Sequence, residues 1–317
     1  MPRDADSRSD FPRRTCGLLV AAAVIAVAGC AAGGATSSGT GGAAASGGAG
    51  GGGGRAGQGP STLTLLVDAD QSSNNDDAGF PPSYSDALFE VALTAASIPY
   101  DTLVISPGAT SPLTAAEFDR YAAVVWYTAG ATADLFSAEQ QAAIERWLDA
   151  GHKTLIVFSE NLLSDLGSGG TWSAPSDNAF LTTYLGAVGW AAGGDAEVAG
   201  MGSLSLEGRL YTVDGGSGSP LAGMHFEVFA NTPLESTADL INPGPNSTVL
   251  ATVDADPADT GTNSAVPIIV AHSIGTSTIV YVGLPVENID GAPKNTSDQL
   301  VRGVLQFADL PGTGLEP

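Results

Sequence analysis

The stretch Ala122-Ala123-Val124-Val125-Trp126-Tyr127 decides the fold of this chain. It is a continuous apolar run, which is typical of a strand that is buried on both faces of a sheet. Apolar residues then recur on one side of a predicted helix over 138–150, which Ser137 can cap and Gly151 can end. A second buried strand is predicted over 153–158. Because a strand, a helix and a strand follow each other, the two strands are expected to be parallel.

The same alternation begins further upstream. The predicted elements are a strand over 63–67 that ends in Asp68, a helix over 83–96, a strand over 100–105, and a short helix that opens at Thr114 with Glu117 at capping-box spacing. This order predicts an α/β fold, namely a doubly wound, mostly parallel sheet with helices on both faces. We expect this domain to occupy residues 61–312, followed by a short tail over 313–317.

The second half of the predicted domain is rich in strands and loops. A helix is predicted over 177–188, and glycine, proline and short β-like runs dominate from Asp195 to Asp254. The later predicted elements are β-like runs over 224–230 and 248–253, two better strands over 266–271 and 277–282 with a hairpin-like turn over 273–276, and a terminal helix over 298–307 capped from 295–297. An inserted or appended β-rich section is therefore expected.

The N-terminal region reads as a secretory signal over 1–29. Arg13 and Arg14 precede an apolar stretch from Gly17 to Val27, which is too short to span a bilayer stably. The run Val27-Ala28-Gly29-Cys30 resembles the lipobox of bacterial lipoproteins. That resemblance implies cleavage before Cys30 and attachment of fatty acyl chains such as palmitate to its thiol. The alternative is an ordinary cleaved signal in which Cys30 is incidental.

Residues 31–60 are almost wholly glycine, alanine, serine and threonine, so 30–60 is predicted to be the lipidated Cys30 followed by a disordered tether. About thirty such residues reach roughly 30 Å, enough to hold a domain clear of lipid head groups. Several buried acyl chains hold a protein on a membrane where one short chain does not. Since Ala31 follows Cys30, the resemblance implies the outer membrane of the bacterial cell envelope.

Composition excludes several kinds of function. The net charge is −23, so the surface repels phosphate backbones and no nucleic-acid partner is expected. The two cysteines are Cys16 and Cys30, and cleavage before an acylated Cys30 leaves the mature chain without a free thiol. A disulfide, a cysteine nucleophile and a cysteine metal ligand are then all unavailable.

The order of several segments resembles the class I glutamine amidotransferase-like domains, which are flavodoxin-like. It is similar in particular to the non-catalytic members that are appended to secreted bacterial proteins. The segments that carry this resemblance are 65–70, 84–93, 98–101, 118–126, 148–153 and 279–285. The resemblance covers most of residues 61–310 and implies the fold of the family.

The same resemblance weakens the expectation of the family's chemistry. It places a cysteine nucleophile in the turn after the strand that ends at Phe158, and a histidine in a late strand before proline and glutamate. Here the turn reads Ser159-Glu160-Asn161, and Leu284 stands where the histidine is expected, before Pro285. Both catalytic members are missing, so an enzyme is the less expected outcome.

A hydrolase that uses Ser159, with Glu160 nearby, is the alternative function. Such a serine needs a base, and the chain has only His152, His225 and His272. His152 lies at the opposite end of the same predicted strand, roughly 20 Å away at about 3.3 Å per residue. The other two histidines lie in β-like runs, where a structural imidazole is the usual finding.

Acidic side chains gather where the first strand ends, at Asp68, Asp70, Asp76 and Asp77. Ligands bind at the carboxyl ends of strands in open α/β sheets, and carboxylate oxygens suit Ca²⁺. The loop lacks the glycine and glutamate of an EF-hand. It is therefore either a site for Ca²⁺ or another cation, or a polar turn that caps the next helix, and no other cofactor is expected.

Five aromatic residues, Trp126, Tyr127, Trp172, Tyr184 and Trp190, could form a carbohydrate-binding ledge or could simply be core and loop anchors. The sequence thus predicts a lipid-anchored, non-catalytic binding domain with an envelope protein or a polysaccharide as partner. The alternatives are a hydrolase that uses Ser159 or the acidic loop, and a spacer with no ligand.

Overall fold

The computed structural model describes residues 62–69, 84–105, 113–128, 134–167, 178–190, 203–205, 210–229, 237–254, 265–290 and 296–310. All of them belong to one compact unit, Arg55–Pro317. The predicted signal peptide, Cys30, the tether, Asp70, Asp76, Asp77 and the tail lie outside the described residues. Among the described helices, none has the length and apolar character that a membrane crossing requires.

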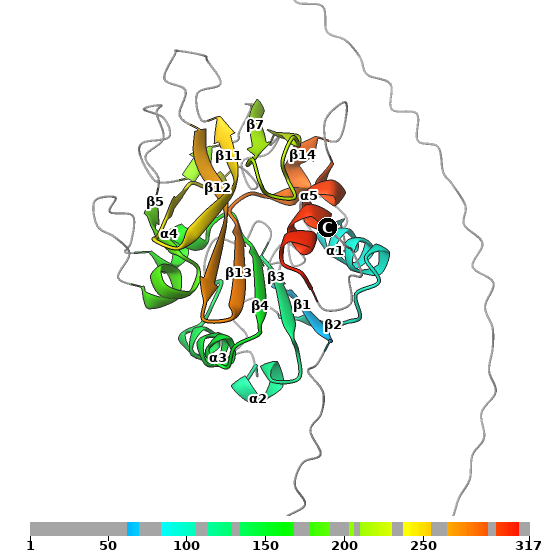
Figure 1. Cartoon of the computed structure of the whole chain (residues 1–317), viewed down its shortest axis with the longest axis vertical. Helices are drawn as coiled ribbons and strands as arrows, with labels where there is room; N and C mark the ends of the chain where they lie inside the picture. The colour runs from blue at the N-terminus through cyan, green and yellow to red at the C-terminus, as the bar shows by residue number, and fades with distance from the viewer. Residues whose placement is uncertain are drawn as a thin grey trace, which may run out of the picture. The chain divides into compact units, whose positions relative to one another are not determined.

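One ten-stranded mixed sheet forms the centre of this unit (Figure 1). Its parallel half contains β1 (Thr64–Asp68), β2 (Tyr100–Val104), β3 (Ala123–Tyr127), β4 (Thr154–Phe158) and β13 (Ser277–Val282). These strands lie in the order β2-β1-β3-β4-β13, and every neighbouring pair is parallel. This is the strand order of flavodoxin-like folds. The predicted α/β class and parallel sheet are confirmed.

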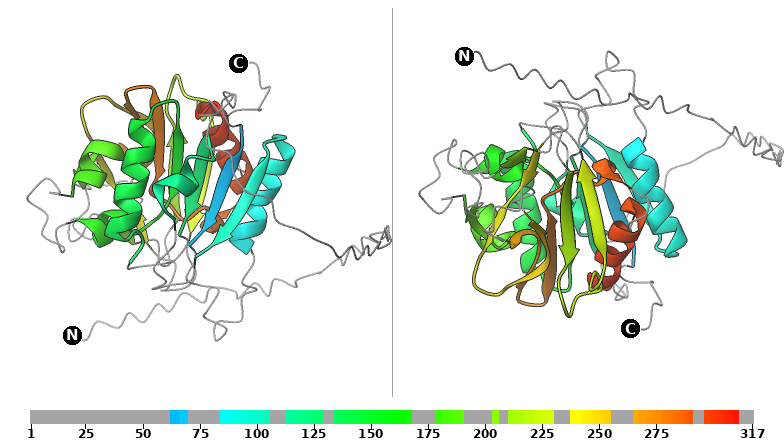
Figure 2. Two further views of the ribbon diagram at one scale, coloured as in Figure 1. Left: turned by 90° about the horizontal axis from the view of Figure 1, so that it is seen from below. Right: turned by 90° about the horizontal axis from the view of Figure 1, so that it is seen from above.

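Helices cover both faces of the parallel strands (Figure 2). On one face, α1 (Tyr84–Ala95) and α5 (Ser297–Phe307) pack on a core that includes Leu66, Val125 and Ile156. On the other face, α2 (Ala115–Phe118), α3 (Ala138–Asp149) and α4 (Leu162–Leu166) pack on a core that includes Leu65, Trp126 and Leu155. Successive strand residues point to opposite faces, so continuous apolar runs supply both cores. The doubly wound arrangement is confirmed.

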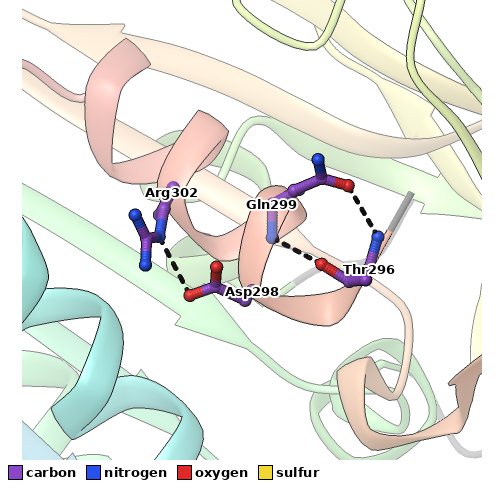
Figure 3. A network of polar contacts seen from close by, with 4 residues as sticks. All are labelled: Thr296, Asp298, Gln299 and Arg302. Carbon is purple, nitrogen blue, oxygen red and sulfur yellow. Dashed lines mark hydrogen bonds and ion pairs between the residues drawn. The ribbon is translucent and has the colours of Figure 1, made fainter. Parts of the chain in front are cut away.

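The helix starts follow local capping chemistry. Ser137 accepts a hydrogen bond from the Gln140 amide at 3.2 Å, and the Gln140 side chain accepts one from the Ser137 amide at 2.7 Å. Thr296 and Gln299 form the same reciprocal pair at the start of α5 (Figure 3). Each pair satisfies two amides that a helix start leaves without partners. The caps predicted at Thr114 and Ser137 are confirmed.

The strand-rich second half continues the same sheet in antiparallel fashion. From β13 outward the order is β12 (Ala265–Ile274), β11 (Ser247–Asp254), β7 (Leu210–Gly215), β8 (His225–Phe229) and β14 (Ile289–Asp290). Two small two-stranded sheets pair β5 (Ala187–Trp190) with β10 (Ile241–Pro243), and β6 (Ser203–Ser205) with β9 (Thr237–Asp239). A short 3-10 turn, Val286–Asn288, follows β13.

The helix predicted over 177–188 is confirmed only in its middle and is wrong at its C-terminal end. One π-type turn, Phe180–Tyr184, is followed directly by strand β5. Gly186 interrupts the helix because its φ is +66°, a left-handed conformation that favours glycine. A Cβ there would also lie 2.4 Å from the Ser247 hydroxyl and 2.6 Å from the His272 ring. Close packing against β11 and β12 therefore overrides the local helical pattern.

Candidate functional site

The turn after β4 lies at the carboxyl ends of the parallel strands and carries Ser159. The Ser159 amide donates to the carbonyl of Val282 at 3.0 Å, so the residue continues the pairing of β4 with β13. The Thr128 hydroxyl donates to Ser159 Oγ at 2.9 Å. Only 2% of Ser159 is exposed. The serine is thus a buried acceptor at the end of the sheet.

A small hollow, partly open to solvent, lies beside this turn. It is lined by Phe89, Tyr127, Phe158, Ser159, Glu160, Leu284, Pro285, Val286 and Glu287. Phe89 stacks on Tyr127 with ring centroids 4.6 Å apart, and its edge meets Phe158 at 4.8 Å. The hollow therefore combines a rigid apolar wall with the hydroxyl and carboxyl groups of Ser159, Glu160 and Glu287.

The two positions at which the resemblance expects catalytic side chains do lie side by side. Ser159 follows β4 and Leu284 follows β13 closely, and both line the hollow. Leu284 is 1% exposed and belongs to the apolar core on the α1 face. Glu160, at 1% exposure, accepts a hydrogen bond of 3.4 Å from the Asn161 side chain. The two expected positions thus lie together, but they hold a buried serine and a buried leucine in place of a cysteine and a histidine.

No histidine of the chain reaches Ser159. His152 precedes β4, at the opposite end of that strand. His272 pairs with Ile279, which pairs with Leu155, so it lies four residues short of Ser159, about 13 Å along the strands. His225 is on β8, five strand positions from β4, which is about 24 Å. All three histidines are described, and they do not form a serine–histidine arrangement with this residue.

The acidic loop can be followed only at its first residue. Asp68 ends β1 and is 5% exposed, and its carbonyl accepts the Ile105 amide at 2.7 Å. Asp68 is not among the residues that line the hollow. In the described part of the chain, no group of three histidine, cysteine or acidic side chains is placed to hold a metal. A Ca²⁺ site that includes Asp70, Asp76 and Asp77 stays a prediction, because those residues lie outside the described ranges.

The aromatic residues do not gather on one surface in the described part. Trp126 is fully buried and stacks on Phe136 at 4.4 Å. Tyr127 is also buried and contacts α1 through Phe89. Tyr184 donates its hydroxyl to Asp149 at 3.1 Å; burial, together with that carboxylate, raises the pKa of Tyr184 to about 12. Trp126 and Tyr127 are thus core anchors, while Trp172 and the Trp190 side chain lie outside the described residues.

The structure adds one buried ionisable pair that the sequence did not reveal, Asp239 and Tyr281. Asp239 has no exposed surface, and its Oδ2 accepts hydrogen bonds from the Leu163 amide at 2.9 Å and from the Tyr281 hydroxyl. Burial raises the pKa of Asp239 to about 8. Burial and the neighbouring Asp239 carboxyl also raise the pKa of Tyr281. No signal marks this pair in the sequence, because β9 has only three residues and its contacts are distant along the chain.

Comparisons with known proteins give distant likenesses. No family model matches the chain, and no curated protein matches it. A β-galactosidase from Bacillus circulans is 14% identical with a TM-score of 0.48, over 78% of this chain and 31% of that chain. This chain thus spans under a third of that enzyme.

Two ThuA-like proteins match over most of both chains. The one from Parabacteroides merdae is 16% identical with a TM-score of 0.46, over 78% of this chain and 90% of that chain. The one from Bacteroides uniformis is 13% identical with a TM-score of 0.47, over 80% of this chain and 94% of that chain. These likenesses are too distant to assign a family or an activity. The α/β fold therefore rests on the strand order of the chain itself.

Proposed function

We propose that this chain is a lipid-anchored protein of the bacterial cell envelope whose amidotransferase-like α/β domain binds a partner and does not catalyse a reaction. One observation carries the non-catalytic part of the proposal. Where enzymes of the resembled family carry a nucleophile and a histidine, this chain has buried Ser159 and buried Leu284. A nucleophile needs an exposed oxygen and a base within hydrogen-bond reach. Ser159 is 2% exposed, and none of the three histidines lies near it.

The chemistry of the hollow supports a binding role. Its polar side chains are Ser159, Glu160 and Glu287, and the remaining lining residues are apolar or aromatic. Carboxylates accept hydrogen bonds, and aromatic rings offer apolar contact area. Ser159 and Glu160 are buried, so Glu287, whose side chain is partly exposed, is the lining carboxylate that can meet a partner rich in hydrogen-bond donors, such as a polysaccharide or a basic segment of an envelope protein. The net charge of −23 favours the same kind of partner and disfavours nucleic acid.

The anchoring part of the proposal is tested by replacing Cys30. In cells given labelled palmitate, the wild-type chain is expected to carry label and to fractionate with the outer membrane. Cys30→Ser is expected to carry no label, because it has no thiol to acylate. It should also no longer fractionate with the outer membrane. Cys16→Ser is the matched control, and it should behave as wild type because Cys16 lies upstream of the expected cleavage point. Equal labelling of wild type and Cys30→Ser would contradict the lipid anchor.

The non-catalytic part is tested with a fluorophosphonate probe, which reacts with activated serines. The full chain is expected to stay unlabelled at neutral pH, because Ser159 is 2% exposed and accepts the Thr128 hydroxyl. Gel fluorescence of wild type beside Ser159→Ala makes the measurement, with a known serine hydrolase as positive control. Labelling of wild type that disappears in Ser159→Ala would establish the hydrolase alternative instead.

A further inference from the structure

Strand β9 rests closely on the end of β13. The Asp239 amide donates to the carbonyl of Gly283 at 2.6 Å, and the Gly283 amide donates to the carbonyl of Ile268 at 2.9 Å. A Cβ on Gly283 would lie 2.5 Å from the Asp239 carbonyl oxygen, so only glycine permits this approach. The next residue, Leu284, lines the hollow. A displacement of β9 is therefore expected to shift Gly283 and, with it, Leu284 in the wall of the hollow.

The Asp239 side chain joins three elements through one oxygen. Its Oδ2 accepts the Leu163 amide from α4 and the Tyr281 hydroxyl from β13, while Asp239 itself belongs to β9. The Leu162 amide also bonds to this carboxyl. Since α4 starts directly after Ser159-Glu160-Asn161, these bonds hold the turn beside the hollow. In the described part of the chain, the other oxygen, Oδ1, is buried with no hydrogen-bond partner.

The protonation state of this carboxyl decides how favourable the contact is. An ionised carboxylate with one bare oxygen in an apolar interior is costly, whereas a neutral acid is much less so. Burial accordingly raises the pKa of Asp239 to about 8, and the bonds from Leu163, Tyr281 and Leu162 lower it only in part.

The charged groups around Asp239 do not compensate its ionisation. Tyr281 is the titratable group that bonds to it. On α4, the Asp165 carboxylate instead accepts the amides of Asp134 and Leu135. Glu160 and Glu287 line the hollow. Within the described ranges, no lysine or arginine forms an ion pair with Asp239.

We propose that Asp239 is a proton-dependent latch, which is neutral when it clamps β9 to α4 and to the end of β13, and whose opening beside the hollow is coupled to release of its proton. The latch goes beyond the proposed function, because it depends neither on the lipid anchor nor on the identity of a partner. Its consequence is that the wall of the hollow is held most firmly in acid and progressively less firmly as the pH rises to about 8.

Hydrogen exchange of the full chain between pH 6 and pH 9.5 tests the latch, read by mass spectrometry on peptides that contain Leu163 and Asp239. After correction for intrinsic exchange, the local opening constant is expected to rise by about tenfold per pH unit up to about pH 8, the folded-state pKa of Asp239, and to level off above it. Amides of α3 serve as an internal reference and should show no such rise. In Asp239→Asn, which keeps the shape but cannot ionise, the rise should vanish. An identical pH dependence in wild type and Asp239→Asn would overturn the proposal.

Tyr281→Phe provides a second variant that keeps the ring in the core. The hydroxyl bond lowers the pKa of Asp239, so its removal should raise that pKa and move the pH at which the rise in opening levels off to a higher value. If the rise levels off at the same pH as in wild type, the role of Tyr281 is overturned, and this variant decides the matter if Asp239→Asn fails to fold. Because neither palmitate labelling nor serine labelling enters the measurement, failure of the latch and failure of the proposed function are distinguishable.

Discussion

Trp147→Ala is expected to lower the free energy of unfolding by about 4 kcal/mol, within the usual range for removing a buried tryptophan. Trp147 is 1% exposed and connects α3 to the sheet. Its ring lies 5.9 Å from that of Phe118 on α2, and its Nε1 donates to the Tyr121 carbonyl at 3.2 Å. The Lys153 ammonium lies 5.5 Å from the ring centroid and donates to the same carbonyl at 2.8 Å. Alanine removes the ring contacts with Phe118 and Lys153 and the hydrogen bond from Nε1, and it leaves a cavity.

Guanidinium denaturation of the full chain, followed by far-UV circular dichroism, measures this loss. Trp147→Phe keeps most of the apolar area and loses the hydrogen bond, so it should be less destabilising, by about 1 to 2 kcal/mol. Val91→Ala on α1 is the matched surface control, since Val91 is 56% exposed, and its effect should stay within about 0.5 kcal/mol. A loss below about 1 kcal/mol for Trp147→Ala would contradict the packing of α3 described above.

The stability of the protein relative to Asp239→Asn is expected to fall as pH rises from about 4 to 8. The folded-state pKa of Asp239, about 8, lies above the ordinary value of 3.8, so in this window the folded state holds a proton that the unfolded state has released. Stability from this group is therefore complete below pH 4 and is lost as pH rises to the folded pKa. The slope is about 1.4 kcal/mol per pH unit, which amounts to roughly 5 kcal/mol over the window.

The measurement is the difference in unfolding free energy between wild type and Asp239→Asn at several pH values. Other carboxyl groups titrate in both proteins and cancel in this difference. Asp298→Asn serves as the control, because Asp298 forms a surface ion pair of 2.9 Å with Arg302 on α5 (Figure 3), a kind of pair that contributes little. A difference that does not change between pH 4 and pH 8, or that grows with pH, would show that Asp239 is ionised in the folded protein.

Much of the parallel half could be predicted because its signals are local. The apolar run over 122–127 needs burial on both faces whatever surrounds it, and the structure places β3 in the middle of the parallel strands. Ser137 and Gln140 cap α3 through bonds that span three residues. The helix predicted over 177–188 failed at its C-terminal end for the opposite reason, because the close approach of Ser247 and His272 to Gly186 comes from distant strands.

The sequence predicted which residues lie at the candidate site, but not their burial or their hydrogen bonds. The resemblance pointed to Ser159 and Leu284, and the pairing of β4 with β13 does place them beside one hollow. Burial of Ser159 and its bond with Thr128 could not be predicted, because they depend on how the ends of β3 and β4 meet. Asp239 gave no sequence signal, since its partners Leu163 and Tyr281 are 76 and 42 residues away.

The sequence by itself determined the α/β class, the helix starts, the absence of a cysteine or histidine at the expected catalytic positions, and the expectation of a lipidated Cys30. These features follow from residue type, short-range periodicity and motifs within a few residues. Only the tertiary structure decided that the strand-rich half extends the same sheet and that Asp239 is buried against Tyr281. Strand pairing and burial join residues that are far apart in the chain, and the raised pKa of Asp239 exists only once that pairing has removed its carboxyl from water.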